Sequence, residues 1–432
     1  MKKSIVWFKT DLRITDNETL VRAIAASDEV IPVYCLDERL LKEESMGFKR
    51  IGAFRLKFIL ESITDLDASL RSRGSGIIFR IGKSQEVFPE LARKYGVTKV
   101  FSKKEVAIEE KRIQASVEKA LWKQNCVLEN FSTSTLYHAL DLPFGIKDIP
   151  ESFSSFRKRI EKESPIRTCL ETPEQIKSPN IPTLQLPSLT ELGFEEPIND
   201  SRAVLNFVGG ETEALKRLEH YFFESQSLSR YKETRNELIG ANYSSKFSTW
   251  LAQGCVSARF IYAQVKSYEE KYGANDSTYW LIFELIWRDF FRFMMKKHGA
   301  RLFHFNGFNG LLPPGTSQES ALLQSWINGT TGDAFVDANM RELRHTGFMS
   351  NRGRQNVASY LIDQLKLDWR LGAAYFEEQL IDYDVSSNWG NWAYLAGVGN
   401  DPRGKRVFNT EKQAKDYDAD GQYRKLWLER IQ

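Results

Sequence analysis

The sequence predicts an α/β fold: an amino-terminal, doubly wound parallel sheet joined by a long linker to an all-α domain. Three observations predict it. Short apolar runs alternate with amphipathic helical runs up to about residue 131, eight of the 13 prolines fall between residues 133 and 200, and eight of the ten tryptophans follow residue 240. Strands that alternate with helices are typical of a parallel sheet.

The expected strands of the first domain, residues 1–132, are short and apolar. They cover residues 4–8, 30–35, 77–81, 99–101 and 127–131, and residues 52–72 have the apolar spacing of a helix. This is a Rossmann-like order of elements, but no G-x-G-x-x-G motif follows the first strand. We therefore expect the main cofactor to bind elsewhere in the chain.

The proline-rich segment, residues 133–200, is expected to be a linker without helices or central strands, because proline fixes φ and removes a hydrogen-bond donor. We predict no chemistry in it. The second domain, residues 201–432, has helical spacing and many aromatic residues, which predicts an all-α domain.

Composition is that of an ordinary globular protein. The chain has 60 basic and 57 acidic residues, a net charge of +3, so any affinity for nucleic acid must come from a local patch. The four cysteines form no CxxC motif and the five histidines lack ligand spacing, so we expect buried thiols and no metal site. The apolar runs are too short for export or are interrupted by charge, which predicts a cytoplasmic monomer without a membrane span.

Residues 348–417 combine charged, amide and tryptophan residues at high density. Two arginines precede one helical run and two aspartates follow the next, so in a helical hairpin they would meet as ion pairs, either structural or part of a binding site. Three tryptophans either fill a core or form flat walls for a planar ligand. These residues are Arg352, Arg354, Asp382, Asp384, Trp369, Trp389 and Trp392, and residues 388–394 are expected to be an aromatic, turn-rich segment.

Two other segments mix polar and aromatic residues. Tyr231 is followed by a hydroxyl-rich loop, residues 244–248, which either caps a helix or cradles a diphosphate. In the helix expected over residues 279–297, a polar stripe recurs every fourth position and is either a solvated face or the lining of a cavity. The stripe consists of Glu284, Arg288, Arg292 and Lys296.

Four motifs stand out in this order: Asn351-Arg352-Gly353-Arg354-Gln355, Asp368-Trp369-Arg370, Ser387-Asn388-Trp389-Gly390-Asn391-Trp392 and Asn400-Asp401-Pro402-Arg403. Together they resemble the photolyase/cryptochrome flavoprotein family, in particular its DASH cryptochrome branch. The opening motif Trp7-Phe8-Lys9-Thr10-Asp11-Leu12-Arg13 is similar too, with Lys9 where many members carry arginine.

The resemblance implies a deoxyribodipyrimidine photolyase, in which reduced FAD absorbs blue light and passes an electron to a cyclobutane pyrimidine dimer. It assigns FAD binding to Tyr231, Ser244, Ser245, Lys246, Phe247, Ser248, Arg354, Asp382, Tyr383, Asp384 and Asn388. Asn388 would lie at the N5 edge of the flavin. Trp392 and Trp369 match the inner and middle links of a tryptophan chain that photoreduces FAD, but Thr316 stands where relatives carry the outer link. We therefore expect slower photoreduction, or a route through a nearby tyrosine or Trp326.

The resemblance assigns lesion and DNA contacts to Glu284, Trp287, Arg288, Asn351, Arg352, Gln355, Tyr394 and Gln413. Gln355 and Tyr394 stand where duplex-acting relatives use methionine and tryptophan, which leaves Trp287 as the main stacking wall. A smaller wall recovers less of the cost of extruding bases from a duplex, so we expect a preference for dimers in single-stranded DNA.

Relatives often hold an antenna such as 5,10-methenyltetrahydrofolate in the first domain. Glu109 and Glu110 match the acidic pair that helps to bind it, or they serve the dipole of a helix start. The rival function is a photoreceptor that signals without repair. Such cryptochromes frequently carry a long tail, whereas this sequence stops after a helical segment, residues 423–431. A general flavin oxidoreductase would need a nicotinamide site, and the sequence has no motif for one.

Overall fold

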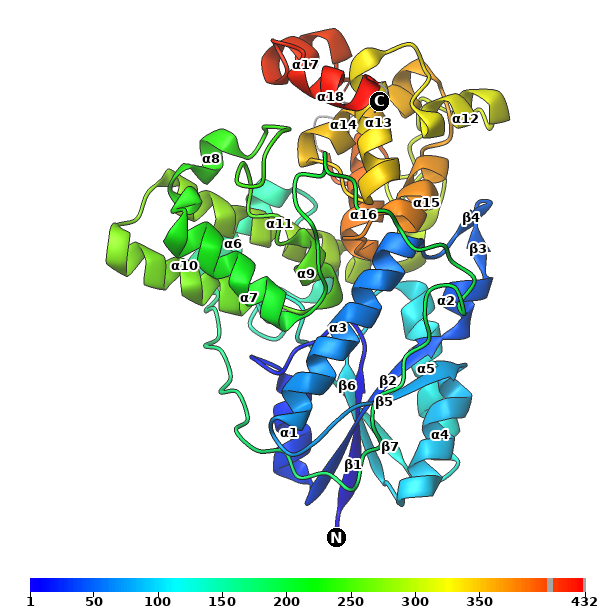
Figure 1. Ribbon diagram of the computed structural model, residues 1–432, viewed down its shortest axis with the longest axis vertical. Coiled ribbons are helices and arrows are strands. Elements are labelled where there is room, and N and C mark those ends of the chain that lie inside the picture. Colours follow the sequence, from blue (N-terminus) through cyan, green and yellow to red (C-terminus); the bar gives the residue numbers. More distant parts are fainter. Residues whose placement is uncertain (402–406, 430–432) are drawn as a thin grey trace.

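The computed structural model describes residues 1–401 and 407–429 (Figure 1). Pro402 and Arg403 of the fourth motif and the end of the last expected helix lie outside these residues. The first part of the chain forms a five-stranded sheet in the order β5-β2-β1-β6-β7, with every pairing parallel. The strands are β1 (Lys3–Phe8), β2 (Glu29–Asp37), β5 (Ile78–Gly82), β6 (Lys99–Lys103) and β7 (Val127–Phe131). The predicted doubly wound sheet is confirmed.

Both faces of the sheet are covered by helices. Successive side chains of a strand point to opposite faces, and here both sets are apolar, so each face must be buried. On β1, Ile5 and Trp7 belong to one apolar cluster, whereas Val6 and Phe8 belong to another. The first cluster includes α4 (Ser84–Tyr95) and α5 (Ile108–Trp122), and the second includes α1 (Glu18–Ala26) and α3 (Ala53–Arg71) (Figure 1). A short antiparallel pair, β3 (Glu44–Ser45) and β4 (Phe48–Lys49), extends toward the helical domain.

The rest of the chain is helical, as predicted. Its helices are α7 (Glu211–Glu219), α8 (Tyr231–Thr234), α9 (Ser248–Gln253), α10 (Ala258–Tyr272), α11 (Asp276–His298), α12 (Ser320–Asn328), α13 (Ala334–Thr346), α14 (Asn351–Ser359), α15 (Trp369–Gln379), α16 (Val385–Leu395), α17 (Thr410–Tyr417) and α18 (Gln422–Leu428). The long helix α11 begins with a capping box between Asn275 and Thr278. Across the described ranges, no helix combines the length and apolar character that a membrane crossing requires.

Two predictions about secondary structure are wrong. The connector contains a helix, α6 (Phe153–Glu163), because no proline occurs between Pro150 and Pro165. Residues 388–394 lie in helix α16 rather than in turns, since Asp384 caps its start by accepting from the backbone N–H of Ser387.

The loop after β1 joins the sheet to the helical domain. The Arg13 guanidinium donates to the carbonyl of Gly254 at 2.9 Å, and the backbone N–H of Leu12 donates to the carbonyl of Gln253 at 3.2 Å. Asp16, which is fully buried, accepts two hydrogen bonds from Arg259 at 2.6 and 3.1 Å. These contacts hold the domains in one arrangement.

Gly254 offers a test of this junction. It has φ +69°, and a Cβ there would lie 2.2 Å from the carbonyl oxygen of Thr10. We expect Gly254→Ala to lower the free energy of unfolding by about 2 to 4 kcal/mol, combining left-handed strain with overpacking. The control Gly96→Ala has a similar left-handed backbone, with φ +66° and ψ 40°, but no neighbour within 4 Å, so it should cost about 1 to 2 kcal/mol. Equal losses in denaturant unfolding would contradict the close approach.

Candidate functional site

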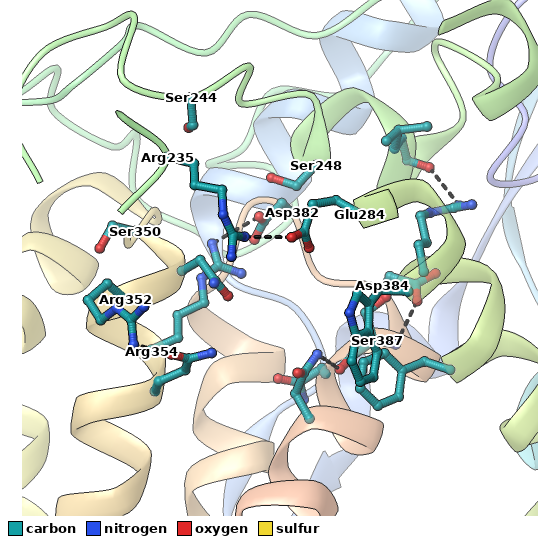
Figure 2. A pocket seen from close by; sticks show the side chains of 18 of the residues that line it. Arg235, Ser244, Ser248, Glu284, Ser350, Arg352, Arg354, Asp382, Asp384 and Ser387 are labelled. Carbon is teal, nitrogen blue, oxygen red and sulfur yellow. Dashed lines mark hydrogen bonds and ion pairs between the residues drawn. The ribbon is translucent and has the colours of Figure 1, made fainter. Parts of the chain in front are cut away.

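A cavity of about 940 Å³ lies among α8, α11, α14, α16 and the loop before α9 (Figure 2). Cavities that hold cofactors typically measure roughly 300 to 1,000 Å³. The structure brings together all the residues predicted for cofactor binding, because each of them lines this cavity: Tyr231, Ser244, Ser245, Lys246, Phe247, Ser248, Arg354, Asp382, Tyr383, Asp384 and Asn388.

The hydroxyl loop, residues 244–248, takes its shape from Arg217 on α7, which the sequence reading missed. Its guanidinium donates to the carbonyls of Ser245 at 3.1 Å, Ser244 at 3.0 Å and Ala241 at 2.8 Å. Burial lowers the pKa of Arg217 to about 10, which still leaves it charged at neutral pH. Because Arg217 binds the backbone carbonyls of the loop, the serine side chains remain available to line the cavity.

Lys246 is the strongest sign of an anionic ligand. The side chain is 3% exposed, and the backbone has φ +58°, a left-handed value that is uncommon for lysine. Its Nζ donates to Ser244 Oγ at 3.4 Å and lies 3.1 Å from the centre of the Tyr243 ring. Burial lowers the pKa of Lys246 well below its usual value. An ammonium held in this way becomes favourable when an anion such as a diphosphate pairs with it.

Arg354 and Asp382 form the predicted ion pair between α14 and the end of α15, with Nη2 and Oδ2 2.9 Å apart. Arg354 Nε also donates to the carbonyl of Met349 at 2.9 Å, which fixes the guanidinium. Asn388 donates Nδ2 to the carbonyl of Ala373 at 2.9 Å, so its Oδ1 is the acceptor that remains for a ligand.

The other two charges predicted to meet at this end, Arg352 and Asp384, have different partners. Arg352 donates instead to Gln355 Oε1 at 3.0 Å and to Asn236 Oδ1 at 3.1 Å. Asp384 caps α16, and although its burial favours the neutral form, Arg288 and Arg292 hold its pKa below the usual range. The chain turns between Asp382 and Asp384, so only the first carboxylate meets α14.

One end of the cavity is walled by aromatic rings. The Trp287 and Tyr394 ring centroids are 6.1 Å apart with planes at 86°. Beside them, Glu284 Oε1 lies 2.5 Å from Arg235 Nη1 (Figure 2). Burial raises the pKa of Glu284 even though Arg235 opposes the shift. Of the polar stripe on α11, Glu284 and Arg288 therefore line the cavity, whereas Arg292 meets Glu105 and Asp384 at the domain junction.

Seven of the eight residues predicted for DNA contacts line the same cavity: Glu284, Trp287, Arg288, Asn351, Arg352, Gln355 and Tyr394. The eighth, Gln413, lies on α17 outside the lining, where its Oε1 accepts from Asn356 Nδ2 at 3.4 Å. Arg288 donates to the carbonyls of Ser134 and Leu251, so it fixes the connector as well as the cavity wall.

The lining also contains residues that were not singled out from the sequence, among them Phe153, Arg235 and Trp280. Arg235 and Trp280 each lie four positions from a predicted residue, Tyr231 and Glu284 respectively, so helical spacing could have found them. Phe153 lies in the connector, and nothing in its local sequence pointed to the cavity.

The predicted tryptophan chain is only partly visible as ring contacts. Trp392 lines the cavity, and its ring centroid is 6.3 Å from that of the fully buried Trp326. Trp369 is fully buried, donates Nε1 to the carbonyl of Phe305 at 2.9 Å and packs edge-on against Trp389 at 5.8 Å. Thr316 is exposed.

The acidic pair predicted for an antenna lies apart from the cavity, at the start of α5. Glu109 makes an ion pair with Arg50 at 2.5 Å, and Arg50 also meets Glu377 on α15 at 2.6 Å. Glu110 is half-buried, and its pKa is raised to about 7, mainly by desolvation. One member of the pair therefore takes part in a contact between the domains.

The lining suits a large, partly anionic, planar ligand. Its polar part contains hydroxyls and the cations Lys246 and Arg354, and its apolar part includes flat or aliphatic side chains such as Trp392 and Leu285. In the described residues, Asp382 Oδ1 and Tyr243 Oη are buried without a hydrogen-bond partner. Buried polar atoms normally find partners, so a bound molecule with both phosphates and ring N–H groups would complete this site. FAD has both.

Two regions of the chain match known protein families. Residues 4–178 match the family described as DNA photolyase, and residues 280–432 match the FAD binding domain of DNA photolyase. The chain is 50% identical over 430 residues to "Cryptochrome DASH" of Gloeobacter violaceus, covering 99% of this chain and 85% of that protein. It is 46% identical over 426 residues to "Cryptochrome DASH" of Synechocystis sp., covering 98% and 87%.

Solved structures of cryptochromes and photolyases have the same fold as this chain. A crystal structure of a Synechocystis sp. cryptochrome superposes with a TM-score of 0.96 at 46% identity, covering 99% of this chain and 89% of that one. An archaeal photolyase from Sulfolobus tokodaii, described as holding two FAD molecules and implying a novel light-harvesting cofactor, superposes with a TM-score of 0.79 at 26% identity, covering 99% and 90%.

The fold and the cavity are those of a photolyase-type flavoprotein, and the chain belongs to the photolyase/cryptochrome family. Its helical part is an FAD-binding domain of the DNA photolyase type. Within the family, the identities over nearly the whole chain place it in the Cryptochrome DASH branch.

Glu342 on α13 provides a pH test of the buried polar groups near the cavity. Tyr423 donates to its Oε2 at 2.6 Å, and burial raises the pKa of Glu342 to about 7. The folded protein therefore binds this proton more tightly than the unfolded chain, and stability falls as pH rises from about 4.5 to 7. Glu342→Gln keeps the acceptor without the charge, so at about pH 8 we expect it to be more stable than the wild type by roughly 1 to 3 kcal/mol.

The control for this prediction is the same pair of proteins at about pH 4.5, where the wild-type carboxyl is largely protonated and the two should unfold alike. A stability difference that does not change with pH would contradict the assignment.

Proposed function

We propose that this protein is a light-dependent repair enzyme that splits cyclobutane pyrimidine dimers in DNA, acting as a monomer with FAD as its cofactor. One observation carries the proposal: a single cavity joins a cradle of hydroxyls and buried cations to an end walled by two perpendicular rings, Trp287 and Tyr394. An electron donor and a base dimer could thus occupy one cavity. A signalling pocket would need the cradle but not the aromatic corner.

The residues that would hold FAD follow from their chemistry. The hydroxyl loop, residues 244–248, and the Lys246 ammonium would bind the diphosphate, since cations and hydroxyls suit phosphate oxygens. Arg354 and Asp382 would border the flavin ring, where the unpartnered Asp382 Oδ1 can accept from a ring N–H. When bound in its reduced form, FAD supplies the electron that light makes available.

Two side chains would tune the reaction. Asn388 offers an uncharged carbonyl oxygen, so it would not repel a negatively charged cofactor as a carboxylate would. Glu284, with a raised pKa, holds a proton more readily than an exposed glutamate and would donate it as a hydrogen bond to a carbonyl oxygen of the dimer. Arg235 would keep that carboxyl in place, because its Nη1 donates to Oε1 at 2.5 Å and leaves the other oxygen to carry the proton.

We propose single-stranded DNA as the preferred substrate. Extruding bases from a duplex costs a few kcal/mol, and each stacked base returns about 1 to 3 kcal/mol. Among the residues assigned to the lesion, Trp287 offers the broadest ring, because Tyr394 is smaller and Gln355 is polar and bound to Arg352. Asn351 is exposed and Arg352 half-buried beside the cavity, so both would contact bases or phosphates.

The direct test uses matched thymine-dimer oligonucleotides, single-stranded and duplex, under blue light and in the dark. We expect light-dependent repair, faster on the single strand by about 10- to 100-fold at low substrate concentration, which corresponds to the extrusion cost. Equal rates on the two substrates would contradict the preference. A flavin-loaded protein that repairs neither would favour the rival function, a photoreceptor.

We further propose a folate antenna, 5,10-methenyltetrahydrofolate, beside Glu109 and Glu110. The half-buried carboxyl of Glu110 supports a hydrogen-bonded ligand there, since its raised pKa lets it donate or accept. The absorption spectrum of the protein used for the repair assay reports both chromophores. Flavin without folate in repeated preparations from a folate-producing host would count against the antenna.

The photoreduction route makes a separate prediction. Trp392→Phe removes the indole that lines the cavity, so light-driven reduction of bound flavin by an external thiol should fall to near zero. Thr316→Trp restores an aromatic ring at an exposed position, next to the backbone contact of Ser317 with Lys366 and Asp368, and should speed reduction. If electrons reach the flavin through Trp326, Trp326→Phe should slow reduction. Photoreduction that all three variants leave unchanged, measured by flavin absorbance, would refute the assignment.

A further inference from the structure

The connector between the domains supplies a ring to the cavity. Phe153, the first residue of α6, lines the cavity and stacks on Trp287. Their ring centroids are 3.6 Å apart and their planes differ by 8°. This is the spacing and alignment of stacked aromatic rings, and it covers one of the two faces of the indole.

Phe153 is itself firmly held. Phe283, Trp287 and Phe290 lie at positions i, i+4 and i+7 of α11, which places them on one stripe of the helix. The Phe153 ring meets Phe283 edge-on at 5.1 Å and Phe290 edge-on at 5.6 Å, and it is 6% exposed. The Phe153 ring is therefore packed between these aromatic side chains of α11 and does not lie loosely over the cavity.

The helix that carries Phe153 is fastened to α11 along its length. Phe156 is fully buried and its ring lies 5.3 Å from that of Phe290. Arg157 donates to Tyr279 Oη at 2.6 Å, and Lys297 near the other end of α11 donates to the carbonyl of Ile149 at 2.6 Å. The backbone before and after Phe153 is thus held at two separated points.

We propose that Phe153 is a positioning residue that fixes Trp287 as a one-sided stacking plate for the damaged bases. Phe153 covers one indole face. The part of the Trp287 ring that lines the cavity, bordered by Tyr394 at 6.1 Å and by Phe291 at 5.6 Å with a plane tilted by 29°, is the surface left for a base. A base then binds a ring whose orientation is already set, so no side-chain freedom is lost on binding. The inference rests on the proposed function, because it concerns how the same cavity selects a dimer.

The test compares Phe153→Leu with the matched control Phe156→Leu. Both variants are flavin-loaded and are measured in the dark. Leucine keeps an apolar side chain but cannot stack. We expect Phe153→Leu to weaken binding of a single-stranded dimer oligonucleotide by about 3- to 10-fold, as loss of an aromatic pair implies. Binding of the undamaged oligonucleotide should be unchanged. Phe156→Leu should lower the melting temperature yet keep the preference for the dimer, and Phe153→Tyr should restore binding.

A second readout does not depend on DNA. Acrylamide quenching of Trp287, obtained by subtracting the same protein with Trp287→Phe, should rise in Phe153→Leu and stay unchanged in Phe156→Leu. If the wild type shows no preference for dimers, the proposed function fails, but unequal quenching would still support the role of Phe153. If Phe153→Leu binds and quenches as the wild type does, or if both leucine variants lose binding equally, the inference is overturned.

Discussion

Buried charge at the junction of the two domains is the constraint on which the rest of the structure depends. Glu105, just after β6, lies 3.4 to 3.7 Å from Lys9, Lys103 and Arg292. Arg292 in turn lies 3.9 Å from Asp384. Removing such ions from water costs several kcal/mol each, so they are tolerated only when all of them meet. Arg292 comes from the helical domain and the other three ions come from the sheet domain, so the cluster links the two domains.

The charges of this cluster shift the pKa values of its members. Burial alone would raise the pKa of Glu105, yet Lys103, Lys9 and Arg292 hold it at about 2. Burial lowers the pKa of Lys103 to about 8. Because Asp384 begins α16, and α16 carries Asn388 and Trp392, the sheet domain helps to place two side chains of the cavity in the helical domain.

The same reasoning separates the two kinds of charge in the cavity. Arg354 meets Asp382, so this cation is compensated by the protein itself. Lys246 has a hydroxyl and an aromatic ring as its nearest neighbours, and burial together with the charge of Arg217 lowers its pKa, although Glu342 opposes the shift. A cavity with one self-sufficient pair and one cation that needs an anion is suited to a ligand with phosphates at one end and a neutral ring system at the other. This agrees with membership in a family whose helical domain binds FAD.

The sequence by itself determined the features that depend on local spacing, namely the parallel sheet, the helical second domain and the polar stripe of α11, and the resemblance of its motifs pointed to many of the residues that line the cavity. Short-range periodicity and a distinctive order of motifs carry that information. Only the tertiary structure decided which groups meet. Arg354 reaches Asp382 whereas Arg352 turns to Gln355, and Phe153 reaches Trp287 from a segment that looked like a featureless linker. Such pairings depend on how helices far apart in the chain pack against each other, and no local pattern records that packing.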